Sequence, residues 1–118
     1  MSHGIEHIDV NGWLPTATIH NGIAYLSGVV PAEGTSVAAQ TRSVLDQIDG
    51  RLARCGTSKK YLLEVSIWLS DISTFGEMNP VYIEWLHGIP PPARACVEAK
   101  LARPEWTVEI RVNAVVPK

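Results

Sequence analysis

Hydrophobic positions along this chain recur with two different periods, which divide it into strands and helices. In several segments apolar and polar residues alternate, a period of two that is typical of a strand with one buried face. These segments are residues 17–20, 23–27, 61–70, 94–101 and 107–116, and a short strand at residues 5–10 would precede them. Apolar residues recur at the spacing of an amphipathic helix in residues 37–55 and again after residue 74. The predicted order is therefore β-β-α-β-α-β-β.

Polar and glycine residues mark the ends of the first elements. Asn21-Gly22 separates the first two strands and favours the two positive φ angles of a type I′ hairpin turn. Ser36 is a suitable N-cap for the first helix, and Gly56 suits the position just after its end.

The start of the second helix has two interpretations. Thr74 and Glu77 have the spacing of a capping box, which places the N-cap at residue 74. Asn79-Pro80 instead has the form of an N-cap followed by proline in the first turn, which places the start later. Prolines at residues 90–92 end the segment.

This order predicts one α+β domain over residues 1–118, with a single mixed sheet and both helices on one of its faces. The opposite face would combine charged and large apolar side chains. The residues predicted there are Leu62, Glu64, Ser66, Trp68, Arg94, Cys96, Glu98, Glu109 and Arg111. Such a face is too apolar for water and too polar for a core, so we expect self-association through it, with polar groups lining clefts between subunits.

Composition and charge exclude several classes of protein. The 118 residues are 46% apolar and 19% charged, which suits one folded domain and not a modular enzyme. The net charge of −2 and the lack of a dense basic run argue against a nucleic-acid partner. No apolar stretch approaches the roughly 18 to 20 residues that span a bilayer, and the N-terminus lacks the pattern of a signal peptide. We therefore expect a cytosolic protein with no membrane partner.

Cysteine and histidine spacing predicts neither a disulfide nor a metal site. Cys55 and Cys96 belong to no Cys-x-x-Cys or Cys/His pattern, so both should be reduced thiols. His3 and His7 have i, i+4 spacing, but Gly4 and the neighbouring isoleucines disfavour a helix there. We predict no metal site.

The C-terminal third carries the pattern that points to chemistry. Judged by spacing alone, Arg94, Cys96 and a glutamate on one sheet face favour a structural interpretation over a catalytic one. They would form a solvated or interface ion pair beside a thiol that only fills space. However, Pro92-Ala93-Arg94-Ala95-Cys96-Val97-Glu98-Ala99, paired with Val108-Glu109-Ile110, resembles the RidA/YjgF family of reactive-intermediate deaminases. Weaker matches extend the resemblance over most of residues 18–118; they include Tyr25-Leu26-Ser27-Gly28, Gln40, Leu45, Ile48-Asp49, Leu69, Asp71, Phe75, Met78-Asn79 and Tyr82.

The resemblance implies a chorismate-mutase-like fold that forms homotrimers, with sites in the clefts between subunits. It also implies cofactor-free hydrolysis of 2-imino or enamino acids to 2-oxo acids and ammonia. By the family pattern, Arg94 holds the substrate carboxylate through its planar guanidinium, and Glu109 orients and deprotonates the attacking water. Ser27, Asn79 and Cys96 are expected to border the substrate.

One segment departs from the family pattern. Many members place a tyrosine of a Gly-Pro-Tyr segment in the pocket, whereas this chain has Gly12-Trp13-Leu14-Pro15 there. Either Trp13 or Leu14 would replace the phenol, and the alternative for Trp13 is a packing role alone. Asn79 likewise has two interpretations, as a ligand contact or as the helix cap.

Three functions follow from these residues. The first is an imine hydrolase. The second is a binding or regulatory module on the same trimer, which would hold a small carboxylate with Arg94 and turn nothing over. Glu109 favours the first, because a binding module has no need of a carboxylate that activates water. The third, a ribonuclease or translation inhibitor, has little physical support at a net charge of −2.

Overall fold

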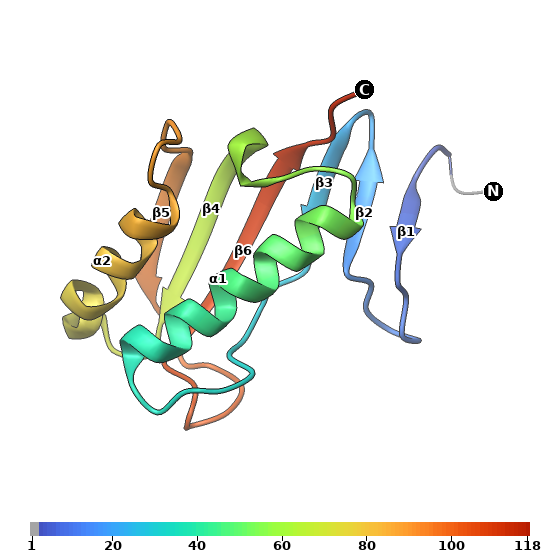
Figure 1. Cartoon of the computed structure of the whole chain (residues 1–118). Helices are drawn as coiled ribbons and strands as arrows, with labels where there is room; N and C mark the ends of the chain where they lie inside the picture. The colour runs from blue at the N-terminus through green and yellow to red at the C-terminus, as the bar shows by residue number, and fades with distance from the viewer. Residues whose placement is uncertain (1–2) are drawn as a thin grey trace.

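A single mixed sheet with both helices on one face forms the structure, a computed structural model that describes residues 3–118 (Figure 1). The order across the sheet is β1-β2-β3-β6-β4-β5. The strands are β1 (Glu6–Ile8), β2 (Ala17–His20), β3 (Ile23–Leu26), β4 (Leu62–Leu69), β5 (Ala93–Glu98) and β6 (Val108–Val115). The helices are α1 (Val37–Arg54) and α2 (Phe75–Trp85), with short 3-10 turns η1 (Lys59–Tyr61) and η2 (Ile72–Thr74). The predicted α+β fold, including the short N-terminal strand, is confirmed.

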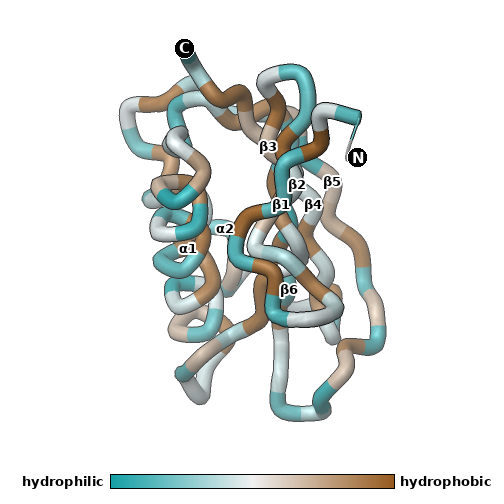
Figure 2. Tube along the Cα trace, turned by 90° about the vertical axis from the view of Figure 1, so that its right-hand side faces the viewer, coloured by the Kyte–Doolittle hydropathy of each residue, from teal (hydrophilic) through white to brown (hydrophobic). Residues whose placement is uncertain are grey.

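Two helical crossovers build the sheet. β3 and β4 both pair antiparallel with β6, so they run in the same direction, and α1 connects them. β4 and β5 pair in parallel, and α2 connects them. Because each crossover returns over the same sheet face, both helices lie in one layer, and Figure 2 shows α1 standing to one side of the sheet. Neither helix among residues 3–118 is long and apolar enough to cross a membrane.

The predicted hairpin is confirmed. Asn21 has a φ of 51° and Gly22 a φ of 77°, and His20 pairs with Ile23 across the two-residue turn. Both central φ angles are positive, which is the requirement of a type I′ turn that Asn-Gly satisfies without strain.

The helix ends resolve the alternatives that the sequence leaves open. The Ser36 side chain accepts a hydrogen bond from the Ala39 N–H at 3.1 Å, which confirms it as the N-cap of α1. α2 starts directly after Thr74, and Pro80 lies inside it. The interpretation of Asn79 as the helix cap is therefore wrong. The turn η2 leads directly into α2, which begins at Phe75, so Asn79 lies inside the helix and not at its start.

Alternate residues of the inner strands fill the core beneath the helices. Val65, Ile67 and Leu69 of β4 are at most 1% exposed, as are Val108, Ile110, Val112 and Ala114 of β6. The predicted residues Glu64, Ser66, Trp68, Glu109 and Arg111 therefore point to the uncovered face, as does Asn113. The prediction is wrong for Leu62, which pairs with Ala114 beside a bulge in β4 and packs against the core.

The orientation of β5 differs from the prediction. Arg94, Cys96 and Glu98 pair with the buried residues of β4 and so lie on the helix-covered face, not on the uncovered one. Glu98 Oε1 accepts a hydrogen bond from the Ile72 N–H at 3.0 Å, and Cys96 packs against the core. β5 is an edge strand whose apolar residues Ala93, Ala95 and Val97 are small, so their burial does not decide its orientation. The polar contacts that Arg94 and Glu98 make with α2 and η2 decide the orientation of β5.

Candidate functional site

The Arg94 guanidinium lies against α2 at the outer edge of the sheet. Its Nη1 donates a hydrogen bond to Asn79 Oδ1 at 2.6 Å. Its Cζ lies 4.9 Å from the centre of the Tyr82 ring and 5.4 Å from that of the Phe75 ring. Both distances are those of cation–π contacts. Arg94 itself is exposed, so the cation is accessible to a ligand.

Cys96 lies two residues further along β5 and faces the same side as Arg94. It is partly buried, and burial raises the pKa of its thiol, while the nearby positive charge of Arg94 lowers it to a lesser extent. The thiolate is the nucleophilic form of cysteine. Cys96 therefore lines this side of the site as a neutral thiol.

Glu109 occupies a different place, on the uncovered face of β6 beside Gly28. A methyl group built on Gly28 would collide with Glu109 Oε2 and lie 3.3 Å from its Cδ, so the carboxylate packs directly against Gly28. Burial raises the pKa of the Glu109 carboxyl. A carboxylate held in this way is a stronger base than one in water.

Ser27 and the loop between β1 and β2 adjoin this second group. The Ser27 hydroxyl donates a hydrogen bond to the Pro15 carbonyl at 2.8 Å, which ties the end of the loop to the strand exit beside Gly28. Leu14, Pro15 and Gly28 line one common cavity. Trp13 is 90% exposed, so its ring is not packed against the rest of its own chain.

The two groups cannot meet within one subunit. Arg94 pairs with Val65 of β4, whereas Glu109 pairs with Trp68 of the same strand. Two strand spacings and three residues therefore separate them, or about 10 Å across the sheet and about 10 Å along it. Their side chains also leave opposite faces. A substrate of a few carbon atoms cannot touch both in a single chain.

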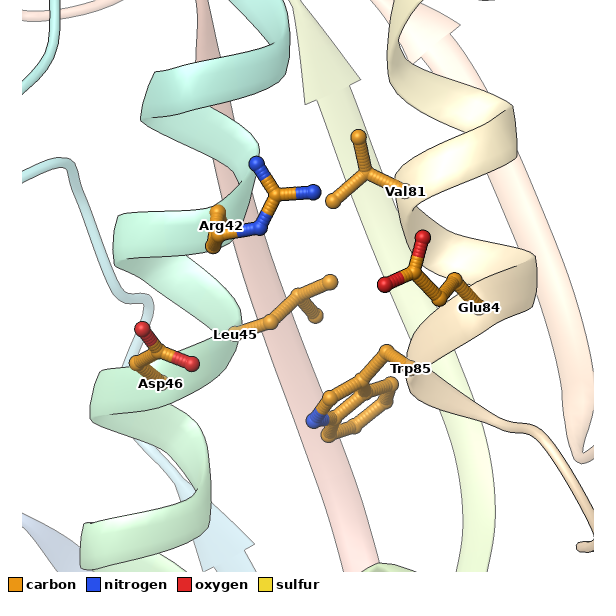
Figure 3. A pocket seen from close by; sticks show the side chains of 6 residues that line it. All are labelled: Arg42, Leu45, Asp46, Val81, Glu84 and Trp85. Carbon is orange, nitrogen blue, oxygen red and sulfur yellow. The ribbon is translucent and has the colours of Figure 1, made fainter.

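A further hollow lies between the two helices (Figure 3). It measures about 140 Å³ and is lined by Arg42, Leu45, Asp46, Val81, Glu84 and Trp85. None of the residues predicted for the site lines it. The hollow is therefore separate from the residues that the sequence predicts for the site.

Comparison with known proteins gives the same fold and a family. The sequence matches the family described as Endoribonuclease L-PSP over residues 6–116. A RutC family protein from Haemophilus ducreyi is 39% identical over 113 residues, which cover 95% of this chain and 97% of the relative. The crystal structure of NMB1025, a YjgF family member from Neisseria meningitidis, is similar with a TM-score of 0.95 and 43% identity, covering 100% of this chain and 99% of that one. The chain belongs to the YjgF family. RutC family protein YoaB from Escherichia coli K12 is a further relative, 33% identical over 95% of this chain and 98% of its own length.

In this YjgF family chain, the predicted site residues fall into two half-sites. The first half-site comprises Arg94, Asn79 and Cys96; the second comprises Glu109, Ser27 and Leu14 with Gly28. Trp13 follows in the loop beside Leu14 and is exposed. The prediction that Arg94, Cys96 and Glu109 share one sheet face is wrong. Sequence reasoning also missed the contact of Phe75 and Tyr82 with Arg94. The signal was present, because residues 75, 79 and 82 recur at helical spacing on α2.

Proposed function

We propose that this protein hydrolyses reactive 2-imino and enamino acids to 2-oxo acids and ammonia, without a cofactor, in clefts between the subunits of a homotrimer. The observation that carries the proposal is the division of a carboxylate-binding cation and a water-activating base between two surfaces of one chain. A second copy that brings its Glu109 half-site against the Arg94 half-site would complete the cleft. The uncovered, partly apolar sheet face supplies a surface for such association.

Arg94 suits the recognition of a planar carboxylate. Asn79 occupies Nη1, and no other hydrogen bond to the guanidinium is present among residues 3–118. A guanidinium has five N–H donors in a fixed fork, so an edge remains for two parallel bonds to a carboxylate. The substrate's acid group would be held there, with its C=N carbon placed across the cleft.

Glu109 suits the activation of water. The imine reacts in its protonated form: the Glu109 carboxylate accepts a proton from water as the oxygen bonds to the carbon, and the C=N electron pair moves to nitrogen, which gives a neutral amino alcohol. The proton on Glu109 then passes to the amino group, and Glu109 accepts the hydroxyl proton as the C=O bond forms, the C–N bond breaks and ammonia leaves. That proton passes to the ammonia, so the sum is one protonated imine plus one water giving one 2-oxo acid plus one ammonium ion.

Two alternatives are less well supported. A binding module would need Arg94 to hold a carboxylate. It would not need Glu109, a glutamate beside Gly28 whose pKa is raised by burial. The family description names an endoribonuclease, but a net charge of −2 does not suit binding to a phosphate backbone. We place the hydrolytic activity in the cytosol, as the sequence predicts.

A coupled assay tests the proposal. A serine or cysteine lyase generates 2-iminopropanoate in solution, and its decay to pyruvate is followed with and without this protein. We expect a clear acceleration over buffer. If several imines with different side chains all decay at the buffer rate, the hydrolase proposal is wrong and carboxylate binding remains.

A further inference from the structure

Three side chains of α2 converge on Arg94. Phe75, Asn79 and Tyr82 are spaced i, i+4 and i+7, which places them within an arc of about 60° on one face of the helix. Asn79 holds Nη1 by a hydrogen bond, and both aromatic rings lie within cation–π distance of Cζ. An exposed arginine seldom has three such partners, because its long side chain otherwise samples many rotamers.

The Tyr82 ring, and not its hydroxyl, makes this contact. Tyr82 is 4% exposed, and its hydroxyl is buried with no hydrogen-bond partner among residues 3–118. Burial raises the pKa of that hydroxyl, whereas the charge of Arg94 lowers it. The hydroxyl therefore stays neutral beside the cation, and the ring face supplies the attraction.

We propose that Phe75 and Tyr82 are positioning residues, which together with Asn79 hold the Arg94 guanidinium in one orientation before a carboxylate ligand arrives. This inference rests on the proposed function for its consequence, which is tighter binding of carboxylate-bearing ligands. An arginine that is already ordered loses less conformational freedom when a ligand binds. The gain in affinity is therefore limited to ligands whose carboxylate bonds to the free N–H groups of the guanidinium. Ligands without a carboxylate gain nothing.

The first arm of the test needs no substrate. Relaxation of the Arg94 Nε–H signal, assigned by its loss in Arg94→Lys, is measured in the full-length protein and in Tyr82→Leu, Phe75→Leu and Tyr82→Phe. We expect greater mobility in both leucine variants and unchanged mobility in Tyr82→Phe, which keeps the ring. Tyr61→Leu is the matched control, since it removes an exposed ring that lies 5.6 Å from Lys60 Nζ, in a contact separate from Arg94. Unchanged mobility in both leucine variants overturns the proposal.

The second arm compares two ligands that differ only in the acid group, pyruvate and pyruvamide. We expect Tyr82→Leu to weaken pyruvate binding about fivefold to tenfold, the range for loss of one partly desolvated cation–π contact, and to leave pyruvamide within twofold. Phe75→Leu should act in the same direction, and it tests the proposal if Tyr82→Leu folds poorly. Equal weakening of both ligands would indicate general damage and overturn the proposal. Failure of wild-type protein to hydrolyse imines contradicts the proposed function, whereas the mobility of Arg94 decides the positioning role independently.

Discussion

The two half-sites hold their charged groups in opposite ways. Arg94 is surrounded by groups that favour its charge, namely an amide oxygen and two aromatic faces, at the exposed edge of the sheet. Glu109 is pressed against Gly28, where burial disfavours its charge and raises its pKa. In the proposed mechanism, the cation that binds the substrate is stabilised, and the carboxylate that accepts a proton is made more basic. The difference is the one expected between a binding group and a general base.

Removal of the base should have the largest effect. Glu109→Gln keeps the shape of the side chain and its place beside Gly28 but cannot accept a proton. We expect kcat for imine hydrolysis to fall by about two to three orders of magnitude, the usual cost of losing a general base. Steady-state hydrolysis of 2-iminopropanoate measures it. Near wild-type kcat in a folded Glu109→Gln protein would mean that water is activated elsewhere.

Arg94→Lys should have the next largest effect, because an ammonium retains the positive charge but not the two parallel N–H donors of a planar guanidinium. We expect kcat/KM to fall by about one to two orders of magnitude, equivalent to the loss of a charge-assisted hydrogen bond. Arg103→Lys is the control, since Arg103 forms an exposed ion pair with Glu105, at 3.7 Å, and a cation–π contact with Trp106, and neither contact involves Arg94. Equal kcat/KM values for the two variants would show that Arg94 is not the carboxylate contact.

The raised pKa of Glu109 also predicts a pH dependence of stability. The folded state binds this proton more tightly than the unfolded state, so its contribution to stability is fully present below the unfolded pKa of about 4.3 and is lost as pH rises through the higher folded value. Glu109→Gln should therefore raise the Tm at pH 7 and lose that advantage near pH 4. Thermal unfolding at both pH values measures the difference. A lower Tm for the variant at pH 7 would mean that the folded protein stabilises the carboxylate.

Cys96→Ser should have the smallest effect. An imine carbon is electrophilic enough for direct attack by water, and burial keeps the Cys96 thiol protonated. We expect activity within about threefold of wild type, as for a residue that lines a pocket without reacting. Mass spectrometry after a substrate quench provides the check. A covalent adduct on Cys96, or a folded but inactive serine variant, would instead identify a thiol enzyme.

Local patterns predicted most of the fold. The Asn21-Gly22 turn and the Ser36 cap depend on adjacent residues, and both form as expected. Gln40 shows the limit of such patterns. It lies on the buried face of its helix, between Val37 and Val44, although it is polar. Its Nε2 donates to the Glu105 carbonyl at 2.9 Å, and its Oε1 accepts from the Thr107 N–H at 2.8 Å. These partners are more than sixty residues away along the chain, so helical periodicity does not reveal them.

The site was harder to predict than the fold, because alternation shows which residues share a face but not which face is covered. Arg94 and Cys96 were correctly placed together, and Glu109 correctly on the uncovered face. The error arose at β5, where small apolar residues alternate with long polar ones. Aromatic side chains on α2 make the covered face favourable for a guanidinium, and this depends on a tertiary contact.

The most direct test of divided half-sites mixes two inactive subunits. Arg94→Met and Glu109→Gln chains with different affinity tags are co-expressed, and trimers that contain both are isolated by tandem purification. Each mixed trimer then has one cleft in which an intact Arg94 faces an intact Glu109 of its neighbour, so we expect about one third of wild-type activity per trimer, while each parent stays inactive. Mixed trimers as inactive as their parents would contradict the account, because both residues would then have to act from the same chain.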